Sequence, residues 1–169
     1  MYTRDEIGDE LVQQDRELQA VVQGRKVMLW RPGQVAALGA QVSLMFGWAG
    51  VSLSLFWLST PSVKTFAYFI VGVIVAAAPM NLLNYRVVRG WPAARTHFYR
   101  FSVSMVVLSG LSLLVCVFGG NKVAIALAGA GLALNAVAMG LIGSRKYALL
   151  SATFRAQRKF LEVGRSGTR

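Results

Sequence analysis

Four long stretches of the chain contain no charged residue and no histidine, and polar residues collect between and around them. These stretches are residues 35–58, 65–83, 101–118 and 123–142. Each meets or approaches the roughly 20 apolar residues that an α-helix needs to cross a hydrocarbon core about 30 Å thick. The connections at 59–64 and 119–122 are long enough only for tight turns. The pattern therefore predicts an all-α integral membrane protein whose four transmembrane helices form two antiparallel hairpins.

Three polar segments surround the two hairpins. Residues 84–100 form a central interval with four arginines, interpreted as a loop that joins the hairpins. Residues 1–33 carry acidic side chains early and apolar side chains at helical spacing, which predicts an amphipathic helix from about residue 3 to 26. Residues 144–169 combine apolar positions with many cations and predict a basic amphipathic helix and tail. The expected organisation is thus 1–33, a four-helix domain at 34–143, and 144–169.

Composition and charge add an orientation to this picture. The chain is 55% hydrophobic and carries a net charge of +11. All but two of its 18 lysines and arginines lie in the two termini or the central interval. Because cytoplasmic loops collect Lys and Arg, we expect a bacterial-type inner-membrane protein with both termini in the cytoplasm. The same rule accounts for the basic balance, so no nucleic-acid partner is expected.

The central arginines lie where anionic lipid headgroups would be. A guanidinium group binds phosphate oxygens in a bidentate manner. Membrane lipids with anionic headgroups are therefore an expected partner. The residues assigned to these headgroups are Arg86, Arg89, Arg95 and Arg100.

Small residues recur at helical spacing in the first and fourth spans. Steps of three and four place such residues on one side of a helix, and their size lets another helix approach closely. The first-span stripe consists of Ala36, Ala40, Ser43, Gly47, Gly50 and Ser54. The fourth-span stripe consists of Ala126, Gly129, Ala133, Ala136, Gly140 and Gly143. We expect helix packing or partner contact above all at Gly47, Gly50, Gly129, Ala133, Ala136 and Gly140.

Amide side chains inside the spans leave two interpretations open. Gln41, Asn81 and Asn135 are suited to hydrogen bonds between helices. They could also line a polar path for a solute, together with the serines of the third span. Pro79 lies one turn before the amides of the second span, and a kink there would serve either packing or transport.

The chain lacks the groups that catalysis and ion coupling require. Six of its seven acidic residues precede residue 34, and it has one histidine and one cysteine. Intramembrane carboxylates, lysines or histidines are the usual markers of proton relays and ion-coupled transport. We therefore expect no enzyme activity, no cofactor and no metal site.

Two functions remain. The first is a non-catalytic membrane protein that acts through helix–helix interaction, as a subunit of a membrane assembly or as an immunity-type protein against a membrane-active toxin. Its partner would be another membrane protein or a second copy of the chain. The alternative is a small oligomeric channel or uncoupled transporter with a Gln/Asn/Ser-lined path.

Overall fold

The computed structural model describes residues 19–20, 23, 33–59, 62–91 and 93–166, and the elements in this part of the chain are helices. Four of these helices are long and apolar enough to cross a membrane, as the sequence predicts for a multi-pass membrane protein. The predicted amphipathic helix at about 3–26 falls almost entirely outside the described residues. The helices are α3 (Gln34–Leu58), α4 (Val63–Val88), α5 (Ala94–Gly119), α6 (Lys122–Gly143) and α7 (Arg145–Ser166).

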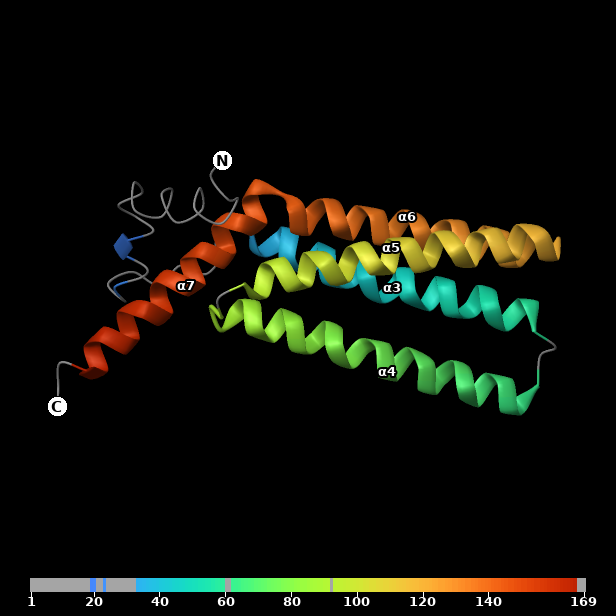
Figure 1. The fold of residues 1–169 in the computed structure, drawn as a ribbon, viewed down its shortest axis with the longest axis horizontal. Coiled ribbons are helices and arrows are strands. Elements are labelled where there is room, and N and C mark those ends of the chain that lie inside the picture. Colours follow the sequence, from blue (N-terminus) through green and yellow to red (C-terminus); the bar gives the residue numbers. More distant parts are fainter. Residues whose placement is uncertain (1–18, 21–22, 24–32, 60–61, 92, 167–169) are drawn as a thin grey trace.

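The four apolar helices lie side by side and alternate in direction, and α7 runs obliquely away from one end of them (Figure 1). The most extensive contact joins α3 to α6, and the next joins α5 to α6. Helix α4 contacts α3 and α5 less extensively. The first and last apolar helices of the chain therefore form the centre of the bundle.

The central polar interval is mostly helical. Helix α4 continues to Val88 and α5 begins at Ala94, so the turn between them comprises only residues 89–93. Long Arg side chains can extend from a helix end to the headgroups, so charge alone does not end a helix at the edge of the apolar core. The interpretation of 84–100 as a loop is thus too wide, and Arg86, Arg95 and Arg100 belong to helices.

At the opposite end of the bundle, one side chain defines where α6 starts. Asn121 Oδ1 accepts hydrogen bonds from the backbone N–H groups of Val123 and Ala124, at 3.1 and 3.2 Å. Such an N-cap satisfies donors that have no partner within the helix. Asn121 Nδ2 donates to the carbonyl oxygen of Trp57 at 3.2 Å, which ties the start of α6 to the end of α3.

Candidate helix-packing and partner surfaces

Helices α3 and α6 approach each other at glycines. A methyl group on Gly131 would lie 2.8 Å from the carbonyl oxygen of Gly47 and 3.0 Å from the backbone nitrogen of Val51. A methyl group on Gly50 would lie 3.1 Å from the carbonyl oxygen of Leu127 and 3.2 Å from Gly131 Cα. These are backbone atoms, which cannot move aside as the end of a flexible side chain can. The structure thus places Gly47 and Gly50 at a direct backbone contact between two helices.

The side of α6 that faces this contact differs from the predicted stripe. The buried residues on the side that faces α3 also recur at helical spacing, and most of them are alanine or glycine. Two faces of the same helix are therefore rich in small residues. The sequence interpretation selected one face and missed the other. The buried residues of α6 are Ala124, Ala128, Gly131, Asn135, Ala138 and Ile142.

The four predicted residues of α6 lie on the other face, which none of the helices α3, α4, α5 and α7 covers. Ala133, Ala136 and Gly140 are exposed, and Gly129 is half-buried. A methyl group on Gly129 or on Gly140 would meet no atom within 4 Å. We call this surface, comprising Gly129, Ala133, Ala136 and Gly140, the outer face of α6.

A hydrogen bond in the middle of the bundle fixes α6 against α5. Asn135 Nδ2 donates to Ser109 Oγ at 2.7 Å, and both residues are fully buried. Asn135 Oδ1 has no hydrogen-bond partner and lies against Gly47, where any side chain would collide with the amide. Nearby, the hydroxyl groups of Ser54 and Ser112 lie 3.2 Å apart and join α3 to α5.

The other two predicted amides form a separate hydrogen-bonded group between α3 and α4. Gln41 Nε2 donates to Asn81 Oδ1 at 3.0 Å, and Asn84 Nδ2 donates to Gln41 Oε1 at 2.6 Å. Trp48 also bridges these helices, because its Nε1 donates to the carbonyl oxygen of Gly72 at 3.4 Å. The three amides are thus one another's hydrogen-bond partners, and together with Trp48 they join α3 to α4.

The structure separates the four central arginines. Arg95 is only 6% exposed, and its Nε and Nη2 both donate to the carbonyl oxygen of Ile142 at 3.4 Å. A cation at this position also interacts favourably with the C-terminal end of the α6 dipole. Arg86, Arg89 and Arg100 are exposed at the same end of the bundle. Arg95 therefore holds two helix ends together, whereas the side chains of the other three are exposed.

Helix α7 packs across this end of the bundle through two glycines that the sequence did not single out. Gly33, with φ of 83°, lies against the carbonyl group of Lys146. Gly90, with φ of 66°, would bring a methyl group to 2.5 Å from the carbonyl oxygen of Phe154. Both positions need a residue without a Cβ for two reasons: the positive φ is strained for other residues, and a Cβ would collide with the backbone of α7.

A buried tyrosine lies where α7 begins. Tyr147 is fully buried, packs beside the Phe98 ring at a centroid distance of 6.3 Å, and its hydroxyl group has no hydrogen-bond partner. Burial raises the pKa of the Tyr147 phenol well above its usual range, and the neighbouring Arg95 cation opposes part of that shift. Tyr147 is thus an uncharged anchor between α7 and α5.

Within the described residues, no group of three His, Cys, Asp or Glu side chains lies close enough together to hold a metal ion. Comparison of the chain with protein-family models, with characterised proteins and with solved structures finds no match in any of the three.

Proposed function

We propose that the protein is a non-catalytic, polytopic protein of a bacterial-type inner membrane that acts through contacts between transmembrane helices. In this proposal it is a subunit of a larger membrane assembly, or an immunity-type protein that recognises a membrane-active toxin. Its partner is another membrane protein or a second copy of the chain. The observation that carries the proposal is the outer face of α6.

This face differs from the other surfaces of the bundle that would meet lipid. Small residues allow the backbones of two helices to approach closely, and the inner face of α6 already uses this property against α3. The outer face offers the same kind of surface, and no helix among the described residues covers it. By contrast, the exposed sides of α4 and α5 carry large side chains, including Val71, Ile74, Val75, Leu111, Leu114 and Val115.

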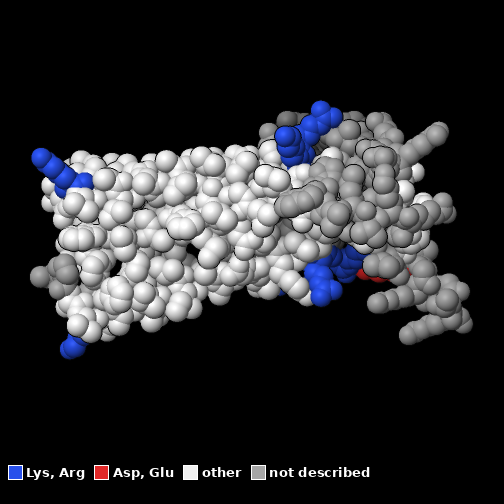
Figure 2. Space-filling model, turned by 180° about the vertical axis from the view of Figure 1, so that it is seen from behind, with Lys and Arg blue, Asp and Glu red and all other residues white. Residues whose placement is uncertain are grey.

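The charge distribution supports the proposed orientation. On the face drawn in Figure 2, lysines and arginines lie at the two ends of the molecule and the band between them carries none. One end has Lys64 and Lys122, whereas the other has the central arginines and the cations of α7. Under the positive-inside rule, this distribution supports a cytoplasmic location for the α7 end.

The C-terminal part of the chain supports a role for α7 as an amphipathic helix at that surface. Its buried side includes Tyr147 and Leu150, and its exposed side includes Arg145, Lys146 and Lys159.

The channel alternative gains no support from the geometry. Gln41 and Asn81 bond to each other, and Asn135 donates to Ser109. These amides would need to face a solute path in a channel, yet they hold helices together instead.

The experiment that tests the proposal adds bulk to the outer face of α6. The test variant carries Gly129→Leu together with Gly140→Leu. The variant and the wild-type chain would each be purified from the native membrane. The amounts of partner protein and of a differently tagged second copy that co-purify would then be compared between the two. Because two large side chains separate the helix backbones, we expect partner recovery to fall about tenfold or more. The variant should still insert, since both positions have open space around them.

The matched control is Gly110→Leu, which adds the same side chain to α5 at a position that also has no atom within 4 Å. Partner recovery should stay at the wild-type value in this control. Unchanged recovery in the Gly129 and Gly140 variant would refute the proposed use of the outer face. An equal loss in the control would assign the effect to added bulk in general.

A further inference from the structure

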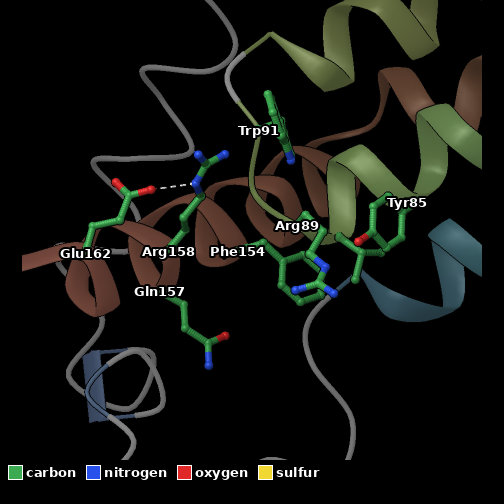
Figure 3. A pocket seen from close by; sticks show the side chains of 8 residues that line it. Tyr85, Arg89, Trp91, Phe154, Gln157, Arg158 and Glu162 are labelled. Carbon is green, nitrogen blue, oxygen red and sulfur yellow. Dashed lines mark hydrogen bonds and ion pairs between the residues drawn. The ribbon is translucent and has the colours of Figure 1, made fainter. Parts of the chain in front are cut away.

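A cleft of about 560 Å³ lies between the end of α4 and the middle of α7. Tyr85, Arg89 and Trp91 line one side, and Phe154, Gln157 and Arg158 line the other (Figure 3). Its walls thus combine cations with aromatic rings. The cleft exists only because α7 packs against the turn at Gly90, and the outer face of α6 takes no part in it.

Aromatic rings hold the arginines of this region in place. The Cζ atom of Arg158 lies 4.9 Å from the centre of the Trp91 ring, and that of Arg86 lies 6.0 Å from the same ring. The Cζ atom of Arg89 lies 5.2 Å from the centre of the Tyr85 ring. Stacking on a ring restricts a guanidinium group while leaving its N–H groups able to donate in the plane.

Among the described residues that line the cleft, two carry positive charge, Arg89 and Arg158, and one carries negative charge, Glu162. Glu162 Oε1 accepts from Arg158 Nε at 2.8 Å, which orients that guanidinium group and neutralises one cation. Arg158 Nη1 is buried and has no hydrogen-bond partner, although a buried donor of this kind is normally paired. Arg89 adds a second guanidinium group to the lining. An anion in the cleft would offset this excess of positive charge, and the accessible part of the Arg158 side chain, which is 36% exposed, could contact it.

The location of the cleft indicates which anion this is. Trp and Tyr collect at the boundary between the apolar core and the headgroups, and Tyr85 and Trp91 are both half exposed at the end of α4. Exposed apolar residues of α4, including Leu82 and Val88, continue from the cleft along the bundle. A phosphate in the cleft would therefore have an apolar surface beside it, on which acyl chains can lie.

We propose that this cleft binds the phosphate group of an anionic phospholipid, with Arg158 and Arg89 as its ligands and Trp91 and Glu162 as positioning residues. An anionic lipid is preferred over a zwitterionic one because the choline cation of the latter would be brought toward guanidinium groups. This site goes beyond the proposed function, since it requires no protein partner and shares no residue with the outer face of α6.

The test measures lipid binding to the purified full-length chain in detergent, by native mass spectrometry, with phosphatidylglycerol and phosphatidylcholine as probes. We expect saturable binding of phosphatidylglycerol and weaker binding of phosphatidylcholine. Changing Arg89→Gln together with Arg158→Gln should weaken phosphatidylglycerol binding about tenfold or more, because charge-assisted hydrogen bonds to phosphate are lost. Arg158→Lys keeps the charge, loses the planar fork, and should give an intermediate loss.

The matched control changes Arg100→Gln together with Lys159→Gln, two exposed cations at the same end that do not line the cleft. Its affinity should stay within about twofold of the wild-type value, because isolated surface charges contribute little. Equal losses in the two double variants would overturn the proposal in favour of general surface attraction. If the cleft variant does not fold, an unchanged affinity in Arg158→Lys overturns it instead.

A further arm separates the lipid from a soluble source of phosphate. Inorganic phosphate would be added to the chain with and without bound phosphatidylglycerol. We expect it to displace the lipid only in large excess, because it lacks acyl chains to lie on α4. Displacement at a concentration equal to that of the lipid would overturn the assignment to a phospholipid.

Discussion

Gly131 is a single residue on which the close approach of α3 and α6 depends. It lies at the backbone contact between α3 and α6, two positions along the helix from Gly129, which has open space around it. Both residues are glycines of the same helix, and they differ in the atoms that an added side chain would meet. They therefore form an internal comparison between a packing site and a surface site.

Replacing Gly131 by Ala should destabilise the protein by about 1–3 kcal/mol, because the new methyl group would press on backbone atoms of Gly47 and Val51. Gly129→Ala should be neutral or stabilising by up to about 1 kcal/mol, since Ala is the better helix former. Unfolding in mixed micelles with increasing denaturing detergent, followed by circular dichroism, measures both. Equal stabilities of the two variants would contradict the contact.

Asn135 identifies the inner face of α6, which the stripe of small residues does not. Nearly every position of α6 is small or apolar, so size alone does not identify its inner face. A polar amide in a span has a reason to face other helices, and the residues at helical spacing from Asn135 are Ala124, Ala128, Gly131 and Ala138. Taking Asn135 as the inward reference would have predicted the buried face.

Among the elements, α7 depends on a close approach that no periodicity could reveal. Its contact with the turn after α4 requires a glycine with positive φ at Gly90 and the absence of a Cβ beside Phe154. Sequence analysis predicts that a basic helix follows the fourth span, because composition and spacing are local properties. Where that helix lies depends on contacts between residues far apart in the chain, such as Gly33 with Lys146.

Gly90→Ala should detach α7 from the bundle, and Gly120→Ala is the control. Both glycines have nearly the same positive φ, 66° and 69°, so both substitutions carry a similar conformational cost. Only at Gly90 would the methyl group also collide with α7, which should add about 1–3 kcal/mol. Hydrogen exchange of the α7 amides should therefore rise markedly in Gly90→Ala alone. Equal protection in both variants would show that the approach at Gly90 does not hold α7.

For the whole molecule, the apolar pattern was enough to predict four membrane-crossing helices, because length and hydropathy are read from contiguous residues. The pairing of the helices was not predictable in the same way. Many pairings of four apolar helices bury similar surfaces, and the extensive contact between α3 and α6 depends on glycines that meet from opposite ends of the chain.

The orientation of the whole molecule has its own test. In a Cys116→Ala background, single cysteines would replace Lys122 and Lys159, which are both exposed. We expect a membrane-impermeant maleimide to label position 122 in spheroplasts, and to label position 159 only after the membrane is opened. The reverse pattern would place the α7 end outside the cell and remove the charge argument.

The contact between α3 and α6 also bears on how the bundle is assembled during synthesis. Gly47 and Gly131 are separated by 84 positions in the chain. At roughly 5–20 residues per second, translation needs about 4 to 17 seconds to cover that distance. Throughout this interval the first apolar helix has been made and its main partner has not. The glycine surface of α3 must therefore remain without its partner helix, in the membrane or in the insertion machinery, until the fourth apolar helix has been synthesised.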